Sequence, residues 1–381
     1  MTTRHAEIAG AGFAGLVAAI ALAERGWSVR VHEKDGVLRA FGAGIFIWEN
    51  GLRVLKAIGA YEAVMHGAHE AIIHETRLDN RIIAELAFTP ALGSRMITMT
   101  RQHLYSAILG RAQQCGVEVV TGSEAIGATG DGTLLTASGH AHRADLVIGA
   151  DGVKSKVRDS LGLLSNRSPC ADGIVRVLAP RCKDELGPGT WDHVIDFWKA
   201  DRSLRILYCP CNERDLYFAM MAPVTNLEAS AVPLRHDVWV AAFPQLEPVI
   251  RKIDASGRYD AYETTSLTRW SSGRVAIVGD AAHAMVPTLG QGAGTAMMNA
   301  LSLAVHLDTA PTIEAALAAW EARERPLTDH TQRRSDLTAR QRLMATGEGW
   351  TDEALRAARH IPTGTSHLPL RIDQQGANNE S

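Results

Sequence analysis

The chain has 381 residues, a formal net charge of −3, and a hydrophobic fraction of 46% against a charged fraction of 21%. This length suits one large domain or two interlocked domains with a substantial core. The near-neutral charge gives no basic field for nucleic acid and no polybasic membrane patch, and no apolar run is long enough to span a membrane.

Cysteine and histidine patterns indicate neither disulfides nor a metal. The five cysteines form no C-x-x-C pair, which argues against a disulfide framework and a zinc site, and no histidine pair forms H-E-x-x-H. The apolar residues 8–23 imitate a signal peptide, but their three glycines and weakly basic flank disfavour that interpretation. We therefore expect a cytoplasmic protein without a bound metal.

The first 33 residues carry the strongest motif. Gly10, Gly12 and Gly15 have G-x-G-x-x-G spacing between a short apolar run and an Ala/Leu-rich helix-like stretch. Gly10 allows a tight turn, Gly12 lets the backbone approach a pyrophosphate, and Gly15 lets the helix pack against the strand. A second strand over 27–32 ends at Glu33, where a carboxylate can accept hydrogen bonds from a ribose diol. The pattern predicts dinucleotide binding.

Two later segments have the same style. Residues 146–149 form a buried strand that ends at Asp151-Gly152, and residues 274–278 form another that ends at Gly279-Asp280. Pro287 and three alternating glycines then open an Ala/Met/Leu-rich helix to about Leu307, whose free N–H groups could stabilise negative charge. An ordinary strand-end turn is the alternative for Asp151. Together the segments predict one nucleotide-binding domain assembled from residues 1–70, 95–170 and 268–345.

The intervening residues have a different pattern. Residues 72–88 are predicted to form short strands, and aromatic residues alternate with polar ones from about 173 to 265, which indicates an antiparallel sheet with one covered face. Residues 71–94 and 171–267 are therefore assigned to a second domain, in which Cys209 and Cys211 pack on one face. Helices are expected at 101–115, 238–243 and 313–341, the last broken at Pro326, and 361–381 is expected to be a flexible tail.

These motifs resemble those of a known family. Gly-Ala-Gly-Phe-Ala-Gly with Glu33, Asp151-Gly-x-x-Ser155-x-x-Arg158, and Gly279-Asp280-Ala-Ala-His-x-x-x-Pro287 resemble the single-component FAD-dependent aromatic hydroxylases, the class of p-hydroxybenzoate and salicylate hydroxylases. The resemblance implies an α/β fold, in which a Rossmann-like FAD-binding domain interlocks with an antiparallel β-sheet substrate domain and C-terminal helices follow. Residues 38–45, 204–212 and 262–265 are similar to members that hydroxylate and open a pyridine ring.

The resemblance also assigns roles to cofactor-binding residues. Glu33 would hold the adenosine ribose, Arg39 and Arg101 the phosphates or ribityl chain, and Asp280 the ribityl chain. The full set implied to bind FAD is Gly10, Gly12, Ala14, Gly15, Glu33, Arg39, Arg101, Asp151, Asp280, Pro287, Gly290, Gly292, Ala293 and Gly294.

Four residues are implied to take part in catalysis: Arg205, Tyr217, His74 and Pro287, the last lying along the isoalloxazine. Arg205 would bind a substrate carboxylate bidentately, and Tyr217 would exchange a hydrogen bond with the ring hydroxyl. His74 replaces a tyrosine of the similar oxygenases, so turnover is expected to titrate near neutral pH. The alternatives are a salt-bridged structural arginine at 205 and a surface strand histidine at 74.

The predicted activity is an FAD-dependent, NAD(P)H-consuming monooxygenase. It would hydroxylate, and open, the ring of a hydroxypyridine carboxylate such as 2-methyl-3-hydroxypyridine-5-carboxylate or 5-hydroxynicotinate, using molecular oxygen through a flavin hydroperoxide. NAD(P)H would bind transiently, which fits the lack of a second G-x-G-x-x-G. The alternatives are a hydroxylase of a benzenoid acid such as salicylate, a flavin-binding redox sensor, and an NAD-linked dehydrogenase. The choice of NADH or NADPH and the oligomeric state stay open.

Overall fold

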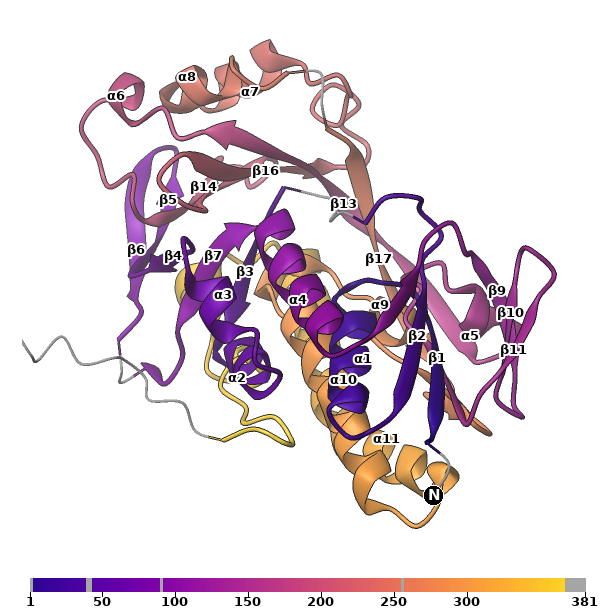
Figure 1. Ribbon diagram of the computed structural model, residues 1–381. Helices are drawn as coiled ribbons and strands as arrows, with labels where there is room; N and C mark the ends of the chain where they lie inside the picture. Colours follow the sequence, from indigo (N-terminus) through magenta and orange to yellow (C-terminus); the bar gives the residue numbers. More distant parts are fainter. Residues whose placement is uncertain (1–2, 39–42, 90–91, 255–256, 367–381) are drawn as a thin grey trace, which may run out of the picture.

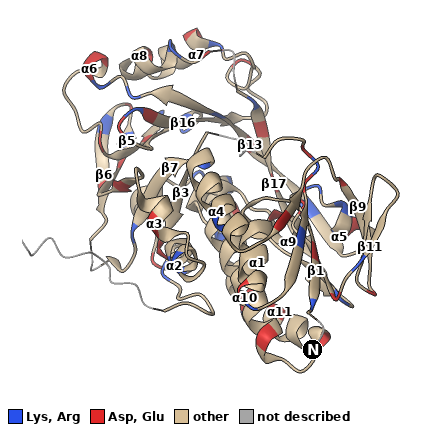
Figure 2. Cartoon of the chain, in the orientation of Figure 1, with Lys and Arg blue, Asp and Glu red and all other residues tan. Residues whose placement is uncertain are grey.

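The structure is a computed structural model that describes residues 3–38, 43–89, 92–254 and 257–366 (Figure 1). It combines a mainly parallel sheet with a large antiparallel sheet, and two long helices close the chain. The α/β class with an added antiparallel sheet and C-terminal helices is thereby confirmed. Figure 2 shows both signs of charge scattered over the elements, as the near-neutral composition leads one to expect.

The six-stranded sheet has the order β18-β19-β12-β1-β2-β8, and every neighbouring pair is parallel except β18 with β19. Its central Ala-, Val- and Ile-rich strands are buried on both faces, which is typical of a parallel sheet covered on each side. The strands are β1 (His5–Ala9), β2 (Ser28–His32), β8 (Glu118–Val120), β12 (Leu146–Gly149), β18 (Ser271–Ser272) and β19 (Val275–Ile277).

Helices cover one face of this sheet, and a three-stranded sheet lies beyond the other (Figure 1). Helix α1 is apolar on nearly every side because it packs between the strands and α10. The covering elements are α1 (Phe13–Ala23), α4 (Arg101–Gln114), α10 (Gly292–Thr309), α5 (Lys156–Ser160), β9 (Ala125–Thr129), β10 (Thr133–Thr136) and β11 (Ala141–Arg143).

The seven-stranded sheet has the order β17-β13-β16-β15-β14-β5-β6 and is antiparallel except at the β14–β5 pair. Strands from residues 73–87 and from 164–267 thus share one sheet. They are β5 (Ile73–Leu78), β6 (Arg81–Ala87), β13 (Leu164–Pro180), β14 (Val194–Trp198), β15 (Arg205–Pro210), β16 (Asp215–Pro223) and β17 (Tyr259–Leu267).

Both faces of this sheet carry buried side chains, so the expectation of one covered face is wrong. Ile206 and Phe218 pack outward with Trp239 of α7, whereas Leu207 and Cys209 lie in a second cluster on the inner side. The alternation within the strands could not reveal the second cover, which is made by outer helices that lie between these strands in the sequence. These outer helices are α6 (Lys183–Leu186), α7 (His236–Ala242), the short helix η2 (Pro244–Leu246) and α8 (Glu247–Ile250).

Cys209 and Cys211 both belong to the inner cluster, and all five cysteines are unpaired. Packing on one face is thus confirmed for this pair. A further three-stranded sheet stands between the two large ones. It comprises β3 (Gly44–Trp48), β7 (Met96–Thr100) and β4 (His69–Ala71), and nearby lie α2 (Glu49–Ala57), α3 (Tyr61–Met65), α9 (Asp280–His283), η3 (Pro287–Leu289) and η4 (Ala345–Gly349).

Helix α11 (Ile313–Arg340) runs through Pro326 without ending, so the predicted break is wrong. Asn299 of α10 explains the continuity, because its backbone carbonyl accepts from Trp320 (2.9 Å) and its side chain donates to Thr328 (3.0 Å). These bonds hold the helix on both sides of the proline, offsetting the lost N–H donor. In the described ranges no helix is long and apolar enough to cross a membrane.

The segment predicted to be a flexible tail is described only as far as residue 366. Thr363 donates to Glu324 at 2.9 Å, and the Ser366 carbonyl accepts from Arg53 at 3.0 Å. These first residues therefore pack against the body of the protein. The remainder, 367–381, lies outside the described residues.

Candidate active site

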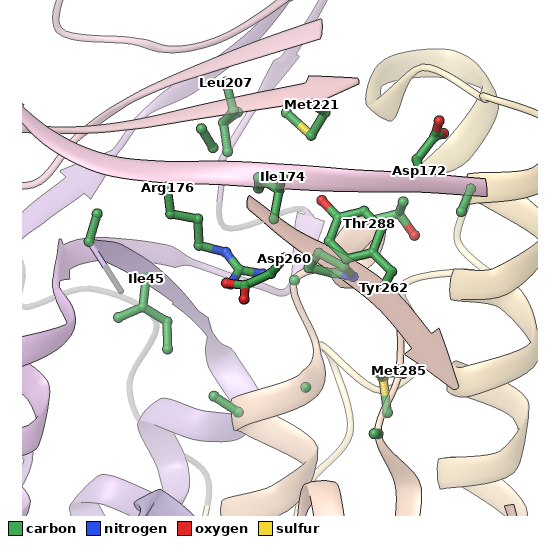
Figure 3. Close-up of a pocket in the computed structure, with 18 of the residues that line it drawn as sticks. Ile45, Asp172, Ile174, Arg176, Leu207, Met221, Asp260, Tyr262, Met285 and Thr288 are labelled. Carbon is green, nitrogen blue, oxygen red and sulfur yellow. The ribbon is translucent and has the colours of Figure 1, made fainter. Parts of the chain in front are cut away.

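A cavity of about 1430 Å³ lies between the two large sheets (Figure 3). One wall is made of the residues that follow the carboxyl ends of β1, β12 and β19, where open α/β sheets bind ligands. The other wall is the inner face of the antiparallel sheet. Because ligand pockets commonly measure about 300–1,000 Å³, this cavity has room for a dinucleotide together with a small ring.

The three glycines of the opening motif have different surroundings. A Cβ atom on Gly10 would lie 2.4 Å from the Ala150 carbonyl oxygen, and one on Gly15 would lie 2.0 Å from that of Gly10. A Cβ atom on Gly12 would meet nothing within 4 Å, and Gly12 lines the cavity. Gly10 and Gly15 are thus needed for the fold itself, whereas Gly12 leaves space that only a ligand can fill.

Two helix N-termini face the same cavity without side-chain caps. Helix α1 begins after Gly12 and α10 after Gln291, neither of which caps with its side chain, and neither first turn contains an acidic residue. Free N–H groups at a helix start favour an anionic group. Among the residues that the structure describes, the buried Arg101 Nε atom at the cavity wall also has no hydrogen-bond partner. The donors fit a phosphate-bearing cofactor.

Glu33 holds the glycine loop in place. Its carboxylate accepts from the Ala11 backbone N–H at 2.9 Å and from that of Asp35 at 3.0 Å. Neighbouring Lys34 lines the cavity. Arg39 lies outside the described residues.

Asp151 uses its carboxylate to cap α5. It accepts from Ser155 Oγ (2.5 Å) and from the Lys156 and Val157 backbone N–H groups (2.8 and 3.1 Å). Asp151 thus lines the cavity, but its carboxylate is already hydrogen-bonded to the start of α5. Gly294 faces α2 instead of the cavity, and a Cβ atom there would lie 2.9 Å from Asn50 Oδ1. Of the implied cofactor residues, Gly12, Ala14, Arg101, Asp151, Asp280, Pro287, Gly290, Gly292 and Ala293 line the cavity.

Asp280 begins α9 at the centre of the cavity wall. Burial raises the pKa of its carboxyl, and the nearby charges of Arg101 and Arg176 oppose that rise. A carboxylate held between two guanidinium groups in a cavity can accept hydrogen bonds from the hydroxyls of a bound molecule.

Arg205 lines the cavity but is already paired. Its Nε donates to buried Asp196 at 2.5 Å, and its guanidinium carbon lies 5.0 Å from the centroid of the Trp198 ring. Trp198 Nε1 also donates to Asp196, at 2.8 Å. The salt-bridged alternative and the cavity-lining expectation therefore hold together for this residue.

Tyr217 lies on the inner sheet face beside a second arginine, Arg176. Burial raises the pKa of Tyr217, and the charge of Arg176 and a hydrogen-bonding contact with it oppose the rise. The buried Tyr262 hydroxyl has no hydrogen-bond partner within the described part of the chain, and burial raises its pKa as well. Arg176 extends toward the cavity beside Asp260, with a 3.4 Å ion pair (Figure 3). This end of the cavity thus combines a weakly paired cation with two phenols.

His74 lies behind the cavity wall instead of on it. Its ring is 4.5 Å from that of Trp350, which does line the cavity, and its Nδ1 lies 3.3 Å from Thr346 Oγ1. Thr76 donates to the same Thr346 oxygen at 2.8 Å, which confirms that His74 and Thr76 share a face. Burial lowers the pKa of His74 to about 4, against the opposing charge of Asp196. The expectation of an imidazole that titrates near neutral pH is therefore wrong.

His74 should instead make folding stability depend on pH. Its folded-state pKa of about 4 lies below the ordinary 6.5, so the unfolded chain binds more protons between these values and stability falls as pH falls. We expect the free energy of unfolding, measured with urea, to fall between about pH 7 and pH 5 by about 2 kcal/mol less in His74→Gln than in wild type. Equal losses in the two proteins would contradict the buried neutral imidazole.

Several cavity residues escaped the sequence analysis. Arg176 lies in a short apolar stretch of β13, but this strand also carries Arg167 and Asp172, so the strand pattern alone does not single it out. Tyr262 belongs to residues 262–265, which are similar to the ring-opening oxygenases but suggested no role for this side chain. Trp350 reaches the cavity from η4 and donates to the Thr288 carbonyl at 3.0 Å, and no local pattern could have indicated it.

Comparisons with known proteins agree with this site. A family model described as "FAD binding domain" matches residues 3–335. A crystal structure of a 2-methyl-3-hydroxypyridine-5-carboxylic acid oxygenase variant superposes with a TM-score of 0.92 and 48% identity, covering 96% of this chain and 99% of the other.

Two curated relatives are also similar. A 2-heptyl-3-hydroxy-4(1H)-quinolone synthase of Mycobacteroides abscessus is 39% identical over 87% of this chain and 89% of the relative. A 6-hydroxynicotinate 3-monooxygenase of Pseudomonas fluorescens is 27% identical over 86% of this chain and 89% of the relative. Together with the free N–H groups that line the cavity, these similarities show that the chain belongs to the FAD binding domain family and is an FAD-dependent aromatic monooxygenase.

Proposed function

We propose that this enzyme hydroxylates a hydroxypyridine carboxylate and opens its ring. The observation that carries the proposal is that Arg176 of β13, Arg205 of β15 and Tyr217 of the intervening strand β16 line one cavity. A guanidinium fork matches a carboxylate, and a phenol can accept or donate a hydrogen bond at a ring hydroxyl. The 48% identity to an oxygenase named for such a substrate supports it.

The chain's own residues would hold FAD along the wall formed by the parallel sheet. Gly12 and the α1 N-terminus would contact the pyrophosphate, Arg101 would contribute positive charge, Asp280 would accept from the ribityl chain, and Pro287 to Ala293 would lie along the isoalloxazine. Once reduced by NAD(P)H, FAD supplies the activation of dioxygen. One oxygen atom would enter the substrate ring and the other would leave as water, with NAD(P)H supplying the two electrons. Opening the hydroxylated ring would then take up one water molecule as the ring bond breaks.

The substrate would lie against the antiparallel sheet. Arg176 is the stronger carboxylate anchor, because its contact with Asp260 is 3.4 Å long whereas Arg205 is tightly paired with Asp196. Tyr217, kept protonated by burial, would donate to the ring hydroxyl or accept from it. The apolar side chains of Ile174 and Leu207 would exclude water from the reacting ring.

The quinolone synthase relative makes an alkylquinolone the second candidate. An alkyl chain could pack against the apolar part of the same wall, which includes Ile174, Leu207, Ala219 and Met221. A neutral quinolone has no carboxylate, so Arg176 would keep only its 3.4 Å contact with Asp260 as a partner of opposite charge. For that reason the hydroxypyridine carboxylate is preferred.

A substrate panel tests the proposal. The FAD-loaded enzyme is incubated with NADH or NADPH and each of 5-hydroxynicotinate, 2-methyl-3-hydroxypyridine-5-carboxylate, salicylate and an alkylated 4-quinolone, and products are identified by mass. We expect NAD(P)H oxidation coupled to an oxygenated product with a hydroxypyridine carboxylate. Product from the quinolone or salicylate alone would contradict the proposal, and the lack of any coupled product would favour the redox sensor.

A further inference from the structure

A compact group of ligating side chains lies on the far face of the parallel sheet, away from the cavity. Glu7 comes from β1, His32 from the end of β2, and His142 from β11 of the small sheet that covers this face. Glu7 and His32 are each only 2% exposed. One ligating atom from each of the three lies within 4.8 Å of the others.

The hydrogen bonds of the group orient two of its members. Glu7 Oε2 lies 2.7 Å from His32 Nε2, and the other ring nitrogen of His32 lies 2.8 Å from Ser123 Oγ. The His142 ring centroid lies 4.7 Å from that of His32. In the described part of the chain, neither ring nitrogen of His142 has a hydrogen-bond partner, so this side chain enters the group uncommitted.

We propose that Glu7, His32 and His142 bind a divalent transition-metal ion of the Zn²⁺ type. Two imidazoles and a carboxylate form a common ligand set for such ions, with a fourth position for water. Ligand atoms about 2.1 Å from one ion at the tetrahedral angle lie about 3.4 Å apart. Glu7 and His32, whose ligating atoms are 2.7 Å apart, would separate slightly to take the ion between them, and His142, which is half-buried on a short strand, would adjust to complete the site. His32 would bind through Nε2 while Nδ1–H donates to Ser123, an outer contact typical of metal-bound histidines.

The charges around the group are compatible with a cation. Arg30 is 3.4 Å from Glu7, but it is paired more closely with Glu118 at 2.9 Å. His5 lies 2.9 Å from the second Glu7 oxygen and can support the carboxylate. No local motif in the sequence indicates this metal site, because the three ligands come from distant segments. The pairing of β1 with β2 brings Glu7 and His32 together, and β11 supplies His142.

A bound ion would stabilise the strand ends that carry the glycine loop. The His32 carbonyl accepts from the Gly10 N–H at 2.7 Å, and the adjacent Glu33 accepts from Ala11. An ion that ties β1, β2 and β11 together binds only the folded protein, so Zn²⁺ should raise the melting temperature.

The test is Zn²⁺ titration calorimetry on the full-length, FAD-loaded protein made without a histidine tag. We expect one ion per chain, with affinity at least about tenfold weaker in His142→Asn and Glu7→Gln. His66→Asn changes an exposed histidine remote from the group and should match wild type. X-ray absorption of the zinc-loaded protein should show nitrogen and oxygen ligands only. A Zn²⁺-induced rise in melting temperature should occur in wild type and be lost in His142→Asn.

Three outcomes would overturn the proposal. The first is the absence of stoichiometric binding to wild type, and the second is equal affinity in wild type and His142→Asn. The third is a sulfur ligand in the absorption spectrum, which would place the ion on a surface cysteine instead. His142→Asn is expected to fold, because the ring makes no hydrogen bond with any described residue that the substitution would break.

Discussion

Gly12→Val is expected to abolish FAD binding while leaving the apoprotein folded. A Cβ atom at this position would meet no protein atom within 4 Å, yet it would project into the cavity where the pyrophosphate would lie. We expect FAD affinity to fall by at least about 100-fold, or about 3 kcal/mol. Stability should drop only by the free energy that bound FAD contributes. The measurement is flavin absorbance per chain, together with circular dichroism of the apoprotein.

Two other glycines serve as controls. Gly110 in α4 also has open space at its Cβ position but lies away from the cavity, so Gly110→Val should retain FAD. Gly15→Val would press a side chain against the Gly10 carbonyl and should impair folding itself. Stoichiometric FAD in purified Gly12→Val would show that the glycine loop does not meet the cofactor.

Arg176→Met is expected to raise the substrate KM by about one to three powers of ten, or roughly 1.5–4 kcal/mol, for loss of a charge-assisted pair with a carboxylate. Arg176 is less firmly paired than Arg205, the other arginine on this sheet that is proposed to meet the substrate. Methionine keeps the length of the side chain without its charge, and FAD content should stay normal. Steady-state kinetics with the best carboxylate of the panel provides the measurement.

Arg205→Met separates substrate binding from structure in the same assay. Its loss leaves Asp196 buried without a cationic partner, so this variant should lose thermal stability and show the smaller rise in KM. Adding Asp196→Asn should recover stability. An unchanged KM in Arg176→Met, with FAD intact, would mean either that Arg205 binds the carboxylate or that the substrate has no carboxylate.

The parts of the structure that depend on local chemistry could be predicted from the sequence. The glycine spacing indicated the β1–α1–β2 unit because strand, turn and helix follow one another within 33 residues. The strands ending near Asp151 and Asp280 were recognised from their apolar runs, and both join β1 in one sheet, directly or through β12. Arg205, which the resemblance assigns to substrate binding, lines the cavity, and its role in binding a carboxylate stays a prediction.

Features that depend on long-range packing could not be predicted. His74 sits on the expected strand face, but Trp350, more than 270 residues later, separates it from the cavity and lowers the pKa of the imidazole through burial. Pro326 stays inside α11 because Asn299 of another helix holds both halves. Gly294 packs against Asn50, although its spacing matches that of the cavity-lining Gly290 and Gly292.

Transfer of an oxygen atom to a hydroxypyridine carboxylate is the most direct test of the proposed function. The FAD-loaded enzyme is supplied with NAD(P)H, isotopically labelled dioxygen and 2-methyl-3-hydroxypyridine-5-carboxylate or 5-hydroxynicotinate, and the product is analysed by mass spectrometry. We expect wild type to form a product that carries one oxygen atom from dioxygen. At low substrate concentration, Arg176→Met should form this product at a strongly reduced rate. Recovery of all consumed dioxygen as hydrogen peroxide, with neither compound labelled, would contradict the proposed function.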